Sequence, residues 1–299
     1  MARMVFLGTP DAAVPPLHAL VGAGHDIAVV VTRPDKKRGR GGALVPSPVK
    51  EAATRLGLPV TDSLEEAAGA GAELGVVVAY GRIVPVAVLD KLPMVNLHFS
   101  LLPRWRGAAP VERAILEGDA ETGVCLMAVE AGLDTGAVYA EESVVIGDEE
   151  TADELRARLV DLGCGLLDRH LGQGAAGLPQ GRDQAGIPTY AEKIQPGERH
   201  LHWERSAAEL GRVVRIGRAW TTFRGRRLGI VRATGQIDPG TAGLGPTRAR
   251  PGALDGTEVA TGDGGRIGLV TVQPEGKRPM DASEWRNGVR PGPEEVLGG

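Results

Sequence analysis

Near its start the chain reads Met4-Val-Phe-Leu-Gly-Thr-Pro-Asp11, and this stretch decides the fold of the first domain. The apolar run predicts a short buried strand, which Gly8 and Pro10 end before a helical stretch over 12–23. A second apolar run follows over 26–31. Two short buried strands joined by a helix indicate a βαβ unit in a parallel sheet. The turn lacks the three glycines of a dinucleotide site, so we expect none here.

The same alternation of strands and helices continues through the first two thirds of the chain. We expect strands over 74–78, 94–98, 124–130 and 137–146, and helices over 48–56, 110–117 and 151–171. The start of the last helix, Thr151-Ala-Asp-Glu154, has the pattern of a capping box, or else a favourable acidic first turn. Residues 1–188 are therefore predicted to form an α/β domain with a Rossmann-like open parallel sheet.

A different pattern occupies the last third. From 172 the composition turns to Gly, Gln, Pro and isolated charges without a sustained period, and we place a linker at 189–205. A helix over 206–216 is followed by short β-like pieces over 227–233, 258–261 and 266–272, separated by Gly and Pro. Short strands with frequent turns predict a small OB-like β-barrel over 206–299.

Charge is distributed unevenly between the two predicted domains. The 299 residues carry a formal charge of −4, but from Ser206 onward there are 14 Lys and Arg against 10 Asp and Glu, which leaves 20 against 28 in the rest. A basic domain on an acidic one is typical of an enzyme with a polyanion-binding module. A basic domain that is merely soluble is the alternative.

The two cysteines, Cys125 and Cys164, lie in apolar segments without metal-ligand spacing, so we expect free thiols and no metal site. No signal peptide is recognised, and no stretch approaches the length of a membrane span. These observations favour a cytoplasmic protein with no membrane partner.

Three polar residues are candidates for catalysis. Asn96 and His98 lie two apart at the carboxyl end of a predicted strand, so both face the same side at the edge where open α/β sheets bind ligands. Asp134 lies in a glycine-flanked turn between two strands, from which it could reach a histidine. A structural histidine at a strand end is the alternative for His98 alone.

Together these side chains suit acyl transfer to an amine. An imidazole takes up a proton near neutral pH, and a carboxylate beside it orients the ring. The Asn96 amide can donate to a developing oxyanion, an effect of roughly 3–4 kcal/mol when well placed. Because no serine or cysteine lies in a recognisable nucleophile motif, direct transfer is favoured.

The run from Asn96 to Pro110, with the glycine-flanked Asp134 turn, resembles the signature of the 10-formyltetrahydrofolate-dependent formyltransferases. The resemblance places the family's catalytic residues on Asn96, His98 and Asp134 and covers most of the chain, strongly to about residue 220. The matching runs are Gly8-Thr-Pro-Asp11, Pro46-Ser-Pro-Val-Lys50, Ala79-Tyr-Gly-Arg-Ile-Val-Pro85, Asn96-Leu-His-Phe-Ser-Leu-Leu-Pro-Arg-Trp-Arg-Gly-Ala-Ala-Pro110, Ala114-Ile-Leu-Glu-Gly118, Glu121-Thr-Gly123, Gly132-Leu-Asp-Thr-Gly136 and Thr189-Tyr-Ala-Glu-Lys193.

The resemblance also implies a folate co-substrate, 10-formyltetrahydrofolate. Its pocket is expected along two segments, where a flat pterin finds apolar walls and backbone hydrogen bonds. These pocket residues are Arg82, Ile83, Val84, Ser100, Leu101, Leu102 and Pro103. A buried apolar turn is the alternative for the second segment. Phe99 departs from the family, which has a smaller residue there, and should reshape the pocket wall.

Family members act on different amines, and two basic regions favour the α-amine of initiator methionyl-tRNA. The first is a Gly- and cation-rich loop over 33–43, in which the resemblance places tRNA contacts on Lys36, Lys37, Arg38 and Arg40. The second is a stripe of seven Arg over 206–232, including Arg212 and Arg215, opposed by Glu209 alone. Solvated basic surfaces are the alternative for both regions.

Two other functions stay open. A sugar-nucleotide N-formyltransferase would use the same donor but would gain nothing from the Arg stripe. A non-catalytic RNA-binding protein would leave the three catalytic candidates far apart. DNA is not expected as a partner.

Overall fold

The computed structural model describes residues 1–38, 42–237 and 249–299, and its contacts divide them into two compact units. The first unit comprises Met1–Val111, Glu121–Val145 and Leu155–Lys193. The second comprises Glu112–Ala120, Ile146–Glu154 and Ile194–Gly299. The chain therefore enters the second unit three times, twice before its C-terminal part.

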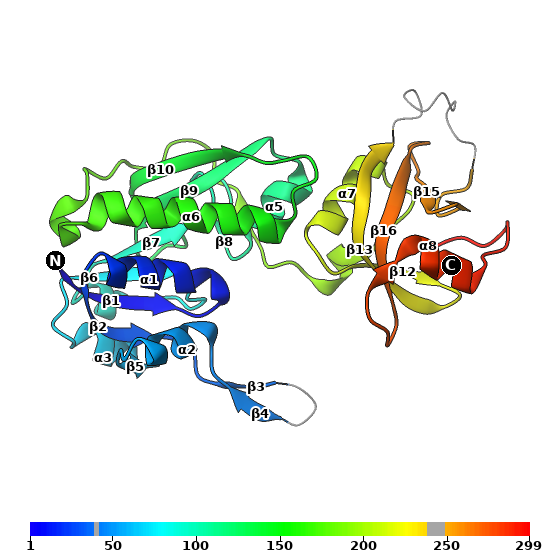
Figure 1. Ribbon diagram of the computed structural model, residues 1–299. Helices are drawn as coiled ribbons and strands as arrows, with labels where there is room; N and C mark the ends of the chain where they lie inside the picture. Colours follow the sequence, from blue (N-terminus) through cyan, green and yellow to red (C-terminus); the bar gives the residue numbers. More distant parts are fainter. Residues whose placement is uncertain (39–41, 238–248) are drawn as a thin grey trace. The chain divides into compact units, whose positions relative to one another are not determined.

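A seven-stranded sheet forms the centre of the first unit, in the order β10-β9-β7-β6-β1-β2-β5 (Figure 1). Neighbouring strands from β7 to β5 are parallel, while β9 and β10 are antiparallel additions beside β7. This confirms the predicted open, parallel-rich sheet. The strands are β1 (Arg3–Gly8), β2 (Asp26–Val31), β5 (Val60–Thr61), β6 (Leu74–Val78), β7 (Met94–His98), β9 (Glu121–Ala128) and β10 (Val138–Val145).

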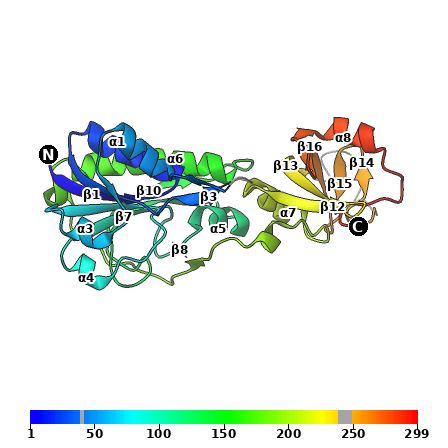
Figure 2. The ribbon, with the colours of Figure 1, turned by 90° about the horizontal axis from the view of Figure 1, so that it is seen from below.

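Helices cover both faces of this sheet, which is why β6 is buried along its whole length. Figure 2 shows α1 and α6 on one face and α3 and α4 on the other. A 3-10 turn, η1 (Asp11–Ala13), precedes α1. The helices are α1 (Val14–Gly22), α2 (Pro48–Arg55), α3 (Leu64–Ala68), α4 (Val86–Leu89) and α6 (Ala152–Leu171).

The start of α6 is a capping box, as the sequence pattern indicated. The Thr151 N–H donates to the Glu154 carboxylate at 2.9 Å, and the Glu154 N–H donates to the Thr151 hydroxyl at 3.3 Å. The two hydrogen bonds satisfy backbone donors that the first turn of a helix leaves free.

Two short strand pairs were not foreseen. The basic loop carries an antiparallel hairpin of β3 (Lys36–Arg38) and β4 (Ala43–Val45). A parallel pair joins β8 (Arg106–Gly107) to β11 (Tyr190–Ala191). The strand β11 lies between 172 and 204, where the sequence shows no sustained period, because a two-residue strand leaves no periodic signal. That segment also holds two 3-10 turns, η2 (Gly174–Gly177) and η3 (Pro196–Arg199).

The second unit is built on an antiparallel sheet, in the order β12-β13-β16-β15-β14 with β17 beside β16. The apolar face of α7, with Leu210 and Val213, packs into the core of this unit with Ile230 and Trp285. Its elements are α7 (Ala207–Arg215), β12 (Ala219–Phe223), β13 (Arg226–Ile237), β14 (Leu254–Asp255), β15 (Glu258–Ala260), β16 (Arg266–Pro274), β17 (Met280–Asp281) and α8 (Ala282–Val289), together with most of α5 (Pro110–Glu117).

Candidate active site

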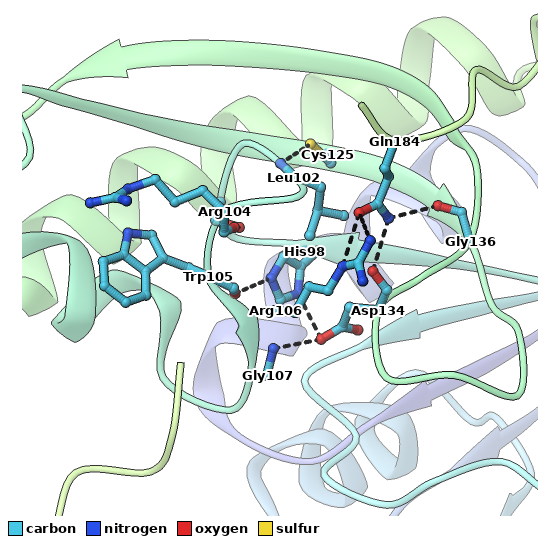
Figure 3. Close-up of polar contacts among 11 residues, drawn as sticks. His98, Leu102, Arg104, Trp105, Arg106, Gly107, Cys125, Asp134, Gly136 and Gln184 are labelled. Atoms are coloured by element: carbon cyan, nitrogen blue, oxygen red, sulfur yellow. Dashed lines mark hydrogen bonds and ion pairs between the residues drawn. The ribbon is translucent and has the colours of Figure 1, made fainter. Parts of the chain in front are cut away.

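His98 ends β7, at the edge of the sheet where the parallel strands β6 and β7 both finish. The ring is buried, with 5% of the residue exposed. Its Nε2 donates to the carbonyl oxygen of Trp105 at 2.8 Å, and its Nδ1 lies 3.6 Å from Oδ2 of Asp134 (Figure 3). Because both neighbours are acceptors, a protonated ring can donate to both, so this geometry can hold a proton taken from an amine.

Asp134 lies in the turn between β9 and β10 and has a left-handed backbone, with φ of 50°. Its Oδ2 accepts a hydrogen bond from the backbone N–H of Gly107 at 2.7 Å. The structure therefore brings together His98 and Asp134, which are 36 positions apart in sequence.

Asn96 lies on β7 two residues before His98, hence on the same side of the strand. The residue is half-buried. Within the described part of the chain, its amide makes no hydrogen bond, which leaves it available to a ligand. Its role as an oxyanion donor stays a prediction.

The loop after β7 is held by a segment that sequence analysis did not single out as part of the site. The Trp105 N–H donates to the Thr189 hydroxyl at 2.9 Å, and the Arg106 N–H donates to the Thr189 carbonyl at 2.9 Å. The N–H groups of Ala108 and Ala109 donate to the carbonyl of Ala191. Trp105 has φ of 62°, so these contacts hold a sparsely populated backbone conformation next to His98.

Gln184 is the other residue that sequence analysis missed. Its Oε1 accepts from Arg106 Nε at 3.0 Å and from Arg106 Nη2 at 2.6 Å. Its Nε2 donates to the carbonyls of Asp134 and Gly136, each at 2.8 Å (Figure 3). An isolated glutamine in a segment without periodicity carries no sequence signal that would have found it.

Two possible nucleophiles near His98, Ser100 and Cys125, are buried and hydrogen-bonded within the protein. The Ser100 hydroxyl is fully buried and donates to the Arg104 carbonyl at 2.5 Å. Burial raises the pKa of the Cys125 thiol to about 12, and its sulfur accepts from the Leu102 N–H. A thiol with such a pKa is protonated at neutral pH. Neither group suits covalent catalysis, and direct transfer stays a prediction.

The expected folate residues differ in exposure. Ile83 is 77% exposed and Arg82 is exposed too, whereas Val84 is buried. In the second segment Leu102 is buried, while Leu101 and Pro103 are half-buried. Two exposed apolar side chains lie at the same sheet edge. Ile83 follows β6, and Leu133, which is 55% exposed, lies beside Asp134.

The residues expected to contact tRNA also differ in exposure. Lys36 is exposed on β3, Lys37 and Arg38 lie on the same strand, and Arg40 lies outside the described residues. Arg212 and Arg215 on α7 are half-buried. Arg215 donates from Nε to the Glu150 carbonyl at 2.7 Å and from Nη2 to the Gly147 carbonyl at 2.8 Å.

More exposed arginines of the stripe lie after α7. They are Arg218, Arg224, Arg226, Arg227 and Arg232, of which Arg224 is ion-paired with Glu295. A cavity of about 680 Å³ in the second unit is lined by Arg215, Arg218 and Arg227 among others. The guanidinium of Arg227 stacks over Trp220, 4.6 Å from its ring centroid. Cations and an aromatic ring on one surface suit contact with nucleic acid.

Among the described residues no group of three His, Cys, Asp or Glu side chains could hold a metal ion. No helix there is long and apolar enough to cross a membrane.

Sequence comparisons decide the family. Residues 2–171 match the family described as Formyl transferase, and residues 193–290 match Formyl transferase, C-terminal domain. The chain belongs to the formyl transferase family. This formyl transferase is 43% identical over 303 residues to the methionyl-tRNA formyltransferase of Cereibacter sphaeroides strain KD131, covering 96% of each chain. That of Clavibacter sepedonicus is 44% identical over 301 residues, covering 96% of this chain and 97% of its own.

Solved structures show the same fold at low sequence identity. An N-formyltransferase from Helicobacter canadensis, in complex with folinic acid and dTDP-3-aminofucose, has a TM-score of 0.68 at 19% identity, covering 92% of this formyl transferase and 100% of its own chain. A methionyl-tRNA formyltransferase from Clostridium thermocellum has a TM-score of 0.61 at 16% identity, covering 80% and 95%. The fold alone therefore does not distinguish between acceptors.

Proposed function

We propose that this formyl transferase moves the formyl group of 10-formyltetrahydrofolate to the α-amine of initiator methionyl-tRNA and so supports the initiation of translation. The observation that carries the proposal is the identity of about 43%, over nearly the whole chain, with relatives that bear the name methionyl-tRNA formyltransferase. This sequence identity extends through the second unit, which carries the exposed arginines of the stripe.

The site suits a folate donor. Its sheet edge presents the exposed apolar side chains of Ile83 and Leu133 and the half-buried amide of Asn96. A flat pterin needs apolar walls and a few polar contacts. The donor supplies an activated formyl group. The chain supplies the groups that orient it and move protons.

His98 is the proton acceptor in this proposal. The attacking amine loses a proton to Nδ1 of the buried His98 ring, because Nε2 already donates to the Trp105 carbonyl, and the Asp134 carboxylate beside Nδ1 stabilises the charged ring. Asp134 is in turn oriented by the Gly107 N–H. Asn96 donates to the oxygen that gains negative charge. A donor aligned in advance lowers the barrier because it need not reorganise during the reaction.

We infer that the tRNA is bound by the basic hairpin of β3 and β4 and by exposed arginines of the second unit. Arg218, Arg226, Arg227 and Arg232 are better placed for phosphate contacts than Arg212 and Arg215, because their side chains are more exposed. Such contacts give affinity without reading sequence.

The alternative acceptor is an amino sugar on a nucleotide. The likeness to the Helicobacter canadensis enzyme motivates it, but at 19% identity that likeness concerns the fold. A non-catalytic RNA-binding protein would have its catalytic candidates far apart. The distance of 3.6 Å between His98 and Asp134 argues against that reading.

The deciding experiment is a formyl-transfer assay with 10-formyltetrahydrofolate and charged initiator methionyl-tRNA, run beside charged elongator methionyl-tRNA. We expect rapid transfer to the initiator and a strong preference over the elongator. Transfer to a dTDP-amino sugar but to neither tRNA would replace the proposed acceptor. No transfer to any of the three would overturn the function.

A further inference from the structure

We propose that Gln184 is a positioning residue for formyl transfer, which holds the turn carrying Asp134 and thereby fixes Asp134 against His98. The inference rests on the proposed function, since it concerns the same reaction. Within the described part of the chain, Gln184 makes no hydrogen bond with His98 or with the side chain of Asp134. It acts through the backbone of the turn.

The surroundings of Gln184 require an amide. On one side the guanidinium of Arg106 can only donate, at 2.6 and 3.0 Å from Oε1. On the other side the carbonyls of Asp134 and Gly136 can only accept, each at 2.8 Å from Nε2. A carboxylate would place an anionic oxygen against two carbonyl oxygens. An apolar side chain would leave all four hydrogen bonds unmade.

The backbone of the turn from Asp134 to Gly136 is strained and closely packed, so it needs contacts that hold it. Asp134 adopts φ of 50°, a conformation that non-glycine residues rarely adopt and that persists where the surroundings enforce it. At Gly136 a Cβ atom would lie 2.1 Å from the Ala128 carbonyl oxygen, so the backbone there is already closely packed. The two hydrogen bonds from Gln184 bracket this stretch from the carbonyl of Asp134 to that of Gly136.

Gln184 also closes a ring of contacts with the loop after β7. Arg106, which it holds, precedes Gly107, whose N–H donates to the Asp134 carboxylate at 2.7 Å. The backbone and the side chain of Asp134 are thus tied to the same two-residue strand, β8, by separate routes. Removing Gln184 breaks the hydrogen bonds to the backbone of the turn and should weaken the hydrogen bond from Gly107 to the Asp134 carboxylate.

Two variants and a matched control test the proposal. Gln184→Glu is nearly isosteric and keeps the acceptor for Arg106, but it loses both donations to the turn. Gln184→Met keeps the volume and loses every hydrogen bond. Gln180→Ala changes an exposed glutamine of the same segment that makes no side-chain hydrogen bond with the described residues. Urea unfolding of all three identifies any variant that fails to fold.

For both Gln184 variants we expect kcat to fall by about 10- to 100-fold, the scale of a misplacement of about 1 Å at a catalytic group. KM for the tRNA and for the folate should change by less than about 3-fold, because Gln184 binds neither. Gln180→Ala should match the wild type. A rise in KM at unchanged kcat would overturn the proposal.

A second measurement does not depend on the reaction. The Gly107 amide proton, in a short bond to a carboxylate, should resonate downfield in spectra of the free protein. In both Gln184 variants we expect it to move upfield and to exchange faster with solvent, while Gln180→Ala leaves it unchanged. An unchanged Gly107 amide in both Gln184 variants would overturn the proposal. If the wild-type protein formylates no tRNA, the proposed function fails, but the amide measurement still decides the role of Gln184 as a clamp.

Discussion

The Asp134 carboxylate and the Gly107 backbone N–H lie 2.7 Å apart, so a turn between β9 and β10 is bonded to the loop that follows β7. The same carboxylate oxygen lies 3.6 Å from Nδ1 of His98. One oxygen thus serves both as an anchor for the loop and as the neighbour of the His98 ring. Substitutions at this point can separate the two roles.

Asp134→Asn should lower activity without disturbing the fold. Its amide oxygen can still accept from Gly107, but the negative charge beside His98 is gone. We expect kcat to fall by about 10²- to 10⁴-fold, the range of general acid–base catalysis. Circular dichroism and steady-state kinetics would measure the two effects. Activity within 2-fold of the wild type would show that the charge is not needed.

His98→Ala should abolish transfer while leaving tRNA binding near that of the wild type. The ring is buried at the sheet edge and bonded to the Trp105 carbonyl, so its removal takes no exposed cation from the protein surface. We expect kcat to fall by about 10²-fold or more, and a filter-binding Kd within 3-fold of the wild type. His18→Ala, on exposed α1 surface, is the control and should behave like the wild type in both assays. Unimpaired transfer by His98→Ala would refute the mechanism.

Arg215→Ala should destabilise the second unit. The guanidinium donates to the carbonyls of Gly147 and Glu150, and its removal leaves these acceptors without that donor. We expect a loss of about 1–3 kcal/mol in the free energy of unfolding, measured in urea. A stability within about 0.5 kcal/mol of the wild type, the usual range for surface substitutions, would show that these hydrogen bonds contribute little.

Charge reversal at the exposed Arg226 and Arg227 should weaken tRNA binding rather than destabilise the fold. Both side chains are exposed on β13, and Arg227 also stacks over Trp220, so Arg226→Glu combined with Arg227→Glu should lower the urea midpoint only slightly. If they contact phosphates, tRNA affinity should fall at least 10-fold and the slope of log Kd against log salt should decrease. An unchanged salt slope would place the tRNA elsewhere on the protein.

Glu295 should titrate far below an ordinary glutamate. Two hydrogen bonds from Arg224, at 2.6 and 2.7 Å, are the main cause that lowers its pKa to about 2. A depressed pKa in the folded state means that this pair stabilises the fold above the ordinary pKa of about 4.5, and that its contribution is lost as the pH falls from there toward 2. In Arg224→Ala the pKa should return toward the ordinary value, measured by carboxyl NMR. Arg226→Ala, at the start of β13 two residues further on, should leave it low. A low pKa that persists in Arg224→Ala would contradict the assigned cause.

The sequence by itself determined the parallel-rich sheet and the candidates at its edge. The limits of β2, β6 and β7 follow from their apolar runs, since a strand buried on both faces needs continuous hydrophobic residues. Asn96 and His98 share a face because strand side chains alternate. These are local properties, so they can be read without the fold.

The tertiary structure alone decided how the site is held. The hydrogen bonds of Gln184, the Thr189 contact to Trp105 and the β8–β11 pair join segments dozens of residues apart. Such contacts depend on where distant loops meet, and a side chain's local sequence carries no record of its remote partner. The same reason separates Arg215, bonded inside the second unit, from the exposed Arg226, although both are arginines of one basic stripe.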